Sequence, residues 1–346
     1  MSRPKIACVD LFCGIGGLTH GLVRGGIRVA AGIDLDANCR FPYESNNRAK
    51  FIEADVRKLS GAELQVFWSG EKYSLLAGCA PCQTFSTYSR KVRKLRRDTR
   101  WELVDEFARL TKEARPDFVT MENVPQLADH EVFQRFLAAL SDYRVWHRVV
   151  ECSEYGVPQT RKRLVLLASR LGEMKLSGKP RRTATVRETI GHLTPLAAGE
   201  SDVDDPLHSA CSLSEINLKR IRASKPGGTW RDWSPELLAE CHRRRSGETY
   251  PSVYGRMEWD APAPTITTQC FGYGNGRFGH PDQDRAITLR EAALLQTFPA
   301  SYRFLKTGER FAFHILGRLI GNAVPVSLGE LVAKSLIAHA SQHQPR

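Results

Sequence analysis

Short apolar runs alternate with amphipathic stretches through the first half of the chain, and this alternation limits the folds available to it. Strand-like runs occur at 6–12, 27–34, 51–55, 73–78, 117–123, 143–152 and 163–169. Helical periodicity is clearest at 101–114 and 131–141. Strands that alternate with helices predict an α/β fold, a Rossmann-like, mostly parallel, doubly wound sheet.

The pattern changes after about residue 171, where Pro, Gly and Ser become frequent and the alternation fades. We expect a smaller, irregular second domain with its hinge at 176–300. The α/β domain then comprises 1–175 and 301–346. An amphipathic stretch at 324–340 predicts a long helix that packs back on the N-terminal sheet.

The charge balance indicates a polyanionic partner. Fifty Lys and Arg face 38 Asp and Glu, a net charge of +12, which suggests nucleic acid, although a merely basic enzyme is the alternative. The nine cysteines are an odd, scattered set, and only Cys79 and Cys82 form a close pair. We therefore expect no structural metal, free thiols in a reducing cytoplasm and, since no run of 18 apolar residues occurs, no membrane segment.

Unusual residues follow the first three strand-like runs, where open α/β sheets bind ligands. Gly14 and Gly16 predict a tight turn that lets the backbone approach a ligand. Asp34 can accept from both hydroxyls of a ribose, and Asp55 can accept from an adenine amino group. The joint placement of these residues predicts a nucleoside-containing cofactor.

Candidate chemistry follows the next two runs, in GCAPC at 78–82 and MENVP at 121–125. A thiolate at Cys82 and an acid at Glu122 facing one cleft suit addition to an electron-poor ring. The C-x-x-C spacing leaves a redox dithiol open. Gln159, Arg161 and Arg163 share one side of a strand start. The basic run at 90–100 is expected to close over phosphates.

In order, these segments resemble the bacterial DNA (cytosine-5) methyltransferases that use S-adenosylmethionine. The resemblance rests on DLFCGIGG, GIDLDA, EADV, APCQTFS, ENV, QTRKR, LREAALLQTFP and GNAVPV, and leaves about 170–285 unmatched. It implies a sequence-specific enzyme that flips a cytosine out of duplex DNA, methylates C5 and releases S-adenosylhomocysteine. Residues 176–300 would then be the target-recognition domain.

The resemblance also implies residue roles. Cys82 becomes the nucleophile at C6 of cytosine, Glu122 the contact to N3, and Arg163 the contact to O2, with Arg161 organising Glu122. Cys79 is then a small buried bystander. Positions that would bind the substrate are Pro81, Gln83, Ser86, Asn123 and Gln159. Positions that match the cofactor pocket are Phe12, Gly14, Gly16, Asp34, Leu35, Asp55, Val56, Asn322 and Val324.

Several alternatives stay open. Asp36 competes with Asp34 for the ribose, and Leu35 replaces an aromatic residue that often stacks on adenine in this family. A tRNA cytosine-5 methyltransferase, a non-catalytic DNA-binding regulator and, less favoured, a nicotinamide dehydrogenase are the rival functions. We expect a monomer near the nucleoid, serving a restriction or defence system whose endonuclease forms no stable complex with it.

Overall fold

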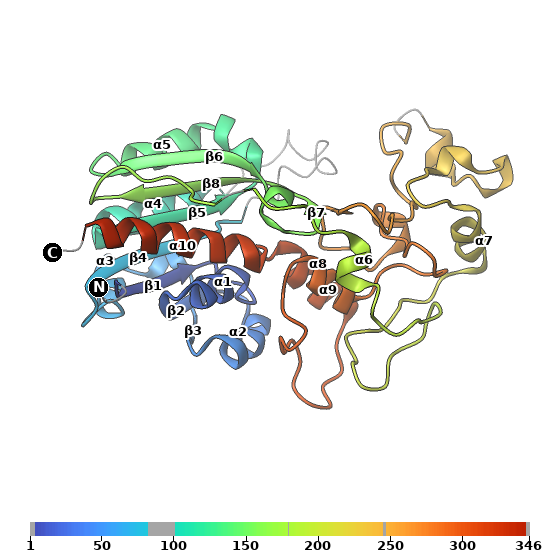
Figure 1. Ribbon diagram of the computed structural model, residues 1–346, viewed down its shortest axis with the longest axis horizontal. Helices are drawn as coiled ribbons and strands as arrows, with labels where there is room; N and C mark the ends of the chain where they lie inside the picture. Colours follow the sequence, from blue (N-terminus) through green and yellow to red (C-terminus); the bar gives the residue numbers. More distant parts are fainter. Residues whose placement is uncertain (1–3, 82–100, 179, 245–246, 344–346) are drawn as a thin grey trace.

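The computed structural model describes residues 4–81, 101–178, 180–244 and 247–343. A layered part with a central sheet holds both chain ends, and a part dominated by coil and short helices projects from it (Figure 1). The sheet comes from the first half of the chain, as the alternation of apolar runs predicts.

Seven strands form the sheet in the order β3-β2-β1-β4-β5-β8-β6. The first five run parallel, whereas β8 pairs antiparallel with both β5 and β6. All seven predicted strands are confirmed. Their bounds are β1 Ile6–Leu11, β2 Arg28–Asp34, β3 Lys50–Glu53, β4 Tyr73–Gly78, β5 Phe118–Asn123, β6 Arg144–Glu151 and β8 Lys162–Ser169.

The strand order reverses between β1 and β4, which places a ligand-binding crevice at the carboxyl ends of these strands. Each face of the sheet carries its own hydrophobic core. One face is covered by α1 (Gly17–Gly25), α2 (Arg40–Asn47) and α10 (Val326–Gln342). The other is covered by α3 (Gly61–Val66), α4 (Glu102–Ala114) and α5 (Glu131–Ala139).

The C-terminal helix α10 lies along α1, which confirms that it packs back on the N-terminal half (Figure 1). Glycines one turn apart on α1 make this close approach possible. A Cβ atom at Gly21 would lie 2.3 Å from the backbone oxygen of Val326, and one at Gly25 would lie 2.2 Å from Ala333 Cβ. Larger residues at these positions would force the two helices apart.

One helical stretch in the described part of the chain, Phe313–Gln342, is long and apolar enough to span a membrane. It comprises α9 (Phe313–Asn322) and α10, and 61% of its most apolar window is buried inside the protein. That burial is what a core helix of a folded domain shows.

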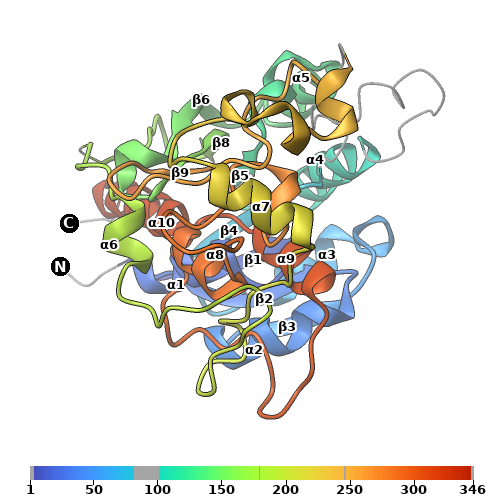
Figure 2. The same cartoon turned by 90° about the vertical axis from the view of Figure 1, so that its right-hand side faces the viewer.

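The rest of the chain is irregular, as the change in composition predicts, and Figure 2 views it end on. Its regular elements are short: β7 (Gln159–Thr160) pairs with β9 (Ala263–Pro264). The helices are α6 Val186–Ile190, α7 Glu215–Ala223 and α8 Leu289–Leu295. The domain limits at 176 and 300 stay a prediction.

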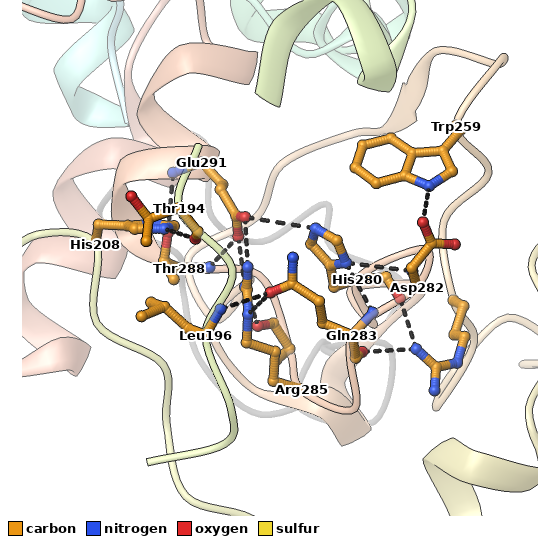
Figure 3. A network of polar contacts seen from close by, with 12 residues as sticks. Thr194, Leu196, His208, Trp259, His280, Asp282, Gln283, Arg285, Thr288 and Glu291 are labelled. Atoms are coloured by element: carbon orange, nitrogen blue, oxygen red, sulfur yellow. Dashed lines mark hydrogen bonds and ion pairs between the residues drawn. The ribbon is translucent and has the colours of Figure 1, made fainter. Parts of the chain in front are cut away.

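Buried polar contacts hold much of this coil in place (Figure 3). The Arg285 guanidinium donates two hydrogen bonds of 2.8 Å to the Glu291 carboxylate, and both side chains are 1% exposed. Glu291 also accepts from the Thr288 backbone at 2.7 Å, and Arg285 Nε donates to Gln283 Oε1 at 2.8 Å. Side chains thus satisfy the polar groups that a strand or helix would pair.

Candidate active site

A cavity of about 1300 Å³ opens at the carboxyl ends of the parallel strands. The ends of β1, β2, β4 and β5 supply one side of its lining. Residues 265–269 of the irregular region and the end of α9 supply the other. The site therefore lies where the sheet topology places ligands, between the sheet and the irregular region.

The glycine turn and Asp34 meet at one end of this cavity. Gly14 adopts a φ of +53°, and its backbone N–H donates to Asp34 Oδ2 at 2.8 Å. Asp34 Oδ1 accepts from the Asp36 backbone at 3.0 Å. Burial raises the pKa of Asp34, and these backbone donors partly offset the rise. The carboxylate is held at the mouth of the turn, and its role as a ribose acceptor stays a prediction.

Asp36, the competing acid, is occupied by other partners. Its Oδ2 lies 2.7 Å from Arg318 Nη2, and its Oδ1 accepts from the Asn38 backbone at 3.0 Å. Burial opposes ionisation here, but the hydrogen bonds from Arg318 and Asn38 outweigh it and lower the pKa of Asp36. This arrangement favours Asp34 for the ribose.

The expected adenine end is less complete. Asp55 lines the cavity, but Arg57 engages its carboxylate, with Nη2 at 2.6 Å from Oδ2, and this contact lowers the pKa of Asp55. Leu35 also lines the cavity and is 66% exposed, whereas Val56, another lining residue, is buried. An exposed apolar side chain offers a surface for a ring, while the role of Asp55 stays a prediction.

Of the remaining positions predicted to bind the cofactor, three line the cavity and Gly16 does not. The three are Phe12, Asn322 and Val324. A Cβ atom at Gly16 would lie 2.7 Å from Asn47 Nδ2, so Gly16 lets the turn pack against α2.

Glu122, at the end of β5, marks the other end of the cavity. Its Oε1 lies 2.9 Å from Arg163 Nε, an ion pair whose side chains are only 7% and 14% exposed. The Cys79 thiol donates to its Oε2 at 2.9 Å. Cys79 is half-buried and lines the cavity, so it is not the fully buried residue that was predicted, while its part in the chemistry stays a prediction.

The expected partner of Glu122 is also corrected. The sequence predicted that Arg161 organises this acid, but Arg163 forms the ion pair. Arg161 is 2% exposed, and its Nη1 and Nη2 donate to the carbonyls of Ile266 at 3.0 Å and Ala323 at 3.4 Å. Burial, and then repulsion by Arg163, lowers the pKa of Arg161 to about 9. Arg161 thus joins the irregular region to the segment after α9.

Of the predicted substrate contacts, Pro81 lines the cavity and is exposed. Asn123 also lines it, and its Nδ2 donates to the Ala80 carbonyl at 3.0 Å, which fixes the segment before Cys82. Gln159 is fully buried and does not line the cavity. Its side-chain Nε2 donates hydrogen bonds to the Leu295 carbonyl and to Gln296 Oε1. The predictions for Cys82, Gln83, Ser86 and the basic run at 90–100 lie outside the described residues.

Asp10 and Arg318 are among the lining residues that the sequence analysis did not single out. Asp10 is buried at the end of β1, where its Oδ2 accepts from the Thr19 hydroxyl at 2.6 Å. Burial raises the pKa of Asp10 to about 7. An acid inside the apolar run IACVDLF was the available signal. Arg318 gave none, because only the tertiary fold brings α9 to the loop after β2.

Fold and site together define an α/β protein in which the glycine turn with Asp34 and the buried acid Glu122 line one cavity. The model of the C-5 cytosine-specific DNA methylase family matches residues 6–338. The chain is 53% identical to the Type II methylase M.HgiDII of Herpetosiphon aurantiacus over 95% of this chain and 94% of that one. It is 30% identical to the Type II methyltransferase M1.HphI of Haemophilus parahaemolyticus, over 97% and 89%.

Solved structures show the same fold. A prophage-encoded protein of E. coli, assigned to the DNA modification methyltransferases, superposes with a TM-score of 0.72 at 22% identity, over 97% of this chain and all of that one. DNMT2 of Spodoptera frugiperda superposes with a TM-score of 0.65 at 17% identity, over 96% of this chain and 99% of that one. The chain belongs to the C-5 cytosine-specific DNA methylase family. Its enzyme class is DNA (cytosine-5)-methyltransferase.

Proposed function

We propose that this chain transfers a methyl group from S-adenosylmethionine to C5 of a cytosine in a specific duplex sequence, as the modification enzyme of a bacterial restriction-modification system. One observation carries the proposal: the Asp34 pocket and the Glu122–Arg163 pair open into the same cavity. The names of the two relatives above, a Type II methylase and a Type II methyltransferase, support it.

The proposed reaction uses two side chains on the base. The Cys82 thiolate adds to C6 of cytosine, and Glu122 supports a proton at N3, so electron density accumulates at C5. The bound cofactor supplies a methyl group on a sulfonium, which C5 attacks. A base then removes the C5 proton, the C5–C6 double bond reforms and the Cys82 thiolate leaves.

Arg163 has two roles in this scheme. It forms an ion pair with Glu122, and in this scheme its guanidinium would also donate to O2 of the flipped base. A buried acid paired with a cation can act on N3 without a water shell around it.

The target base must leave the helix to reach this cavity, because C6 is covered by the stack in duplex DNA. We propose that residues 176–300 grip the duplex and read the sequence, with 265–269 at the cavity. The net charge of +12 favours such a polyanionic substrate.

The test is transfer of a labelled methyl group to duplex DNA and to tRNA, followed by bisulfite sequencing of DNA from cells that express the chain. We expect methylated cytosine at one recurring DNA sequence and none in tRNA. A duplex with 5-fluorocytosine at that site should form a covalent adduct when the cofactor is present. Cys82→Ala should abolish methyl transfer to DNA and formation of the adduct. Cys211→Ala alters a cysteine outside the cavity lining and should leave methyl transfer and the adduct intact.

Methyl transfer to tRNA alone would instead support the alternative of a tRNA cytosine-5 methyltransferase. DNA binding without transfer would support a regulator. Transfer without an adduct would contradict the thiol mechanism while leaving the enzyme class intact.

A further inference from the structure

An ion pair crosses the cofactor end of the cavity between two distant parts of the chain. Arg318 Nη2, on α9, lies 2.7 Å from Asp36 Oδ2, in the loop after β2. Both residues line the cavity, and their side chains are 42% and 22% exposed. The contact therefore ties the loop that follows Asp34 to a helix from the other end of the sequence.

Asp36 transmits this contact to Asp34. The Asp36 backbone N–H donates to Asp34 Oδ1 at 3.0 Å, while its own carboxylate accepts from both the backbone and the side chain of Asn38. These local bonds give the loop one conformation, and Arg318 anchors it to the opposite wall. Movement of Asp36 would withdraw one of the two backbone donors that orient the Asp34 carboxylate.

The positive charge of Arg318 is a second reason to expect that this residue affects the Asp34 carboxylate. A carboxylate accepts ribose hydroxyls best when ionised, yet burial raises the pKa of Asp34, and the Asp36 carboxylate adds to that rise. The Arg318 guanidinium offsets the charge of Asp36. Without it, two neighbouring acids would compete to ionise at the mouth of the glycine turn.

We propose that Arg318 is a positioning residue for the cofactor: by holding Asp36, it fixes the Asp34 carboxylate where the ribose hydroxyls bind. The inference rests on the proposed use of S-adenosylmethionine and assigns the ribose to Asp34. A half-exposed ion pair adds little to stability, so the effect should appear in cofactor binding and not in folding.

The opposite arrangement makes a different prediction. If Asp36 itself held the ribose, Arg318 would compete with the cofactor for its carboxylate. Removing the arginine would then strengthen cofactor binding, while removing the Asp36 charge would weaken it severely.

The experiment measures the Kd of S-adenosylhomocysteine by calorimetry for wild type, Arg318→Met, Arg318→Lys, Asp36→Asn and the Met/Asn double variant. We expect Arg318→Met and Asp36→Asn each to weaken binding about tenfold. The double variant should bind no more weakly than either single one, because both changes remove the same contact. Arg318→Lys should restore most of the affinity.

Steady-state rates separate positioning from a general structural effect. For Arg318→Met we expect a KM for S-adenosylmethionine raised about tenfold, with kcat at saturating cofactor and the KM for DNA within about twofold of wild type. Arg40→Met is the matched control, because its ion pair with Glu53 is similarly exposed and lies outside the cavity lining. It should leave the Kd unchanged.

Wild-type affinity in Arg318→Met, tighter binding, or an equal loss of kcat and DNA affinity would overturn the inference. If the wild-type chain bound S-adenosylhomocysteine but methylated no DNA, the proposed function would fail. The binding comparison would still decide the role of Arg318.

Discussion

Arg163 Nε lies 2.9 Å from Glu122 Oε1, and the two side chains face a single cavity from adjacent antiparallel strands. Glu122 is the penultimate residue of β5, and Arg163 is the second residue of β8, which runs antiparallel to both of its neighbours. The antiparallel strand is thus what brings an arginine to the carboxyl end of β5. A parallel strand would present its own carboxyl end there.

Glu122→Gln keeps the shape of the side chain but removes the acid. We expect kcat for methyl transfer to fall by about 100-fold or more, because an amide cannot share a proton with the ring nitrogen. The Kd of S-adenosylhomocysteine should stay within twofold, since Asp34 lies at the other end of the cavity. Glu151→Gln, which alters another acid of the same lining, is the control and should retain activity. Equal losses in both variants would contradict the role of Glu122.

Cys79→Ala removes the thiol that donates to Glu122 Oε2. A thiol is a weak donor, so we expect a loss of about 1 kcal/mol in transition-state stabilisation, which is about fivefold in kcat. Cys79→Ser keeps a donor and should lose less. Single-turnover rates on one duplex provide the measurement. An unchanged rate in Cys79→Ala would show that the thiol contact does not orient the acid.

The buried Asp10 makes stability depend on pH. Burial raises its pKa from 3.8 to about 7, so between these values the folded state binds more protons than the unfolded state, and stability falls as pH rises. Asp10→Asn lacks this dependence. The difference in free energy of unfolding between Asp10→Asn and wild type should therefore shift in favour of the variant from pH 5 to pH 7, by at most about 3 kcal/mol. Urea unfolding at each pH measures this shift, and a constant difference would contradict it.

The Arg285–Glu291 pair tests what holds the irregular region. Glu291→Gln leaves a buried guanidinium without its counter-charge, which should lower the free energy of unfolding by about 3–5 kcal/mol. Asp260→Asn breaks an exposed ion pair with Arg187 and should leave the midpoint of urea unfolding unchanged. Equal midpoints for the two variants would mean that the network in Figure 3 does not support the coil.

Local pattern was sufficient for the seven strands, the return of the C-terminal helix and the glycine turn. Each depends on the spacing of apolar residues or on backbone freedom, and both are properties of neighbouring residues. Motifs such as ENV and QTRKR identified Glu122 and the arginines as candidates through the resemblance to the family.

The division of labour between those arginines was decided by tertiary structure. Arg161 and Arg163 are two residues apart, and the sequence assigned Glu122 to the first, whereas the register of β8 against β5 gives it to the second. The ion pair that occupies Asp36 likewise depends on a remote residue, because Arg318 lies 282 positions away in the sequence. A short sequence pattern specifies which groups are available; the distances that set their partners and charges exist only once remote segments have packed together.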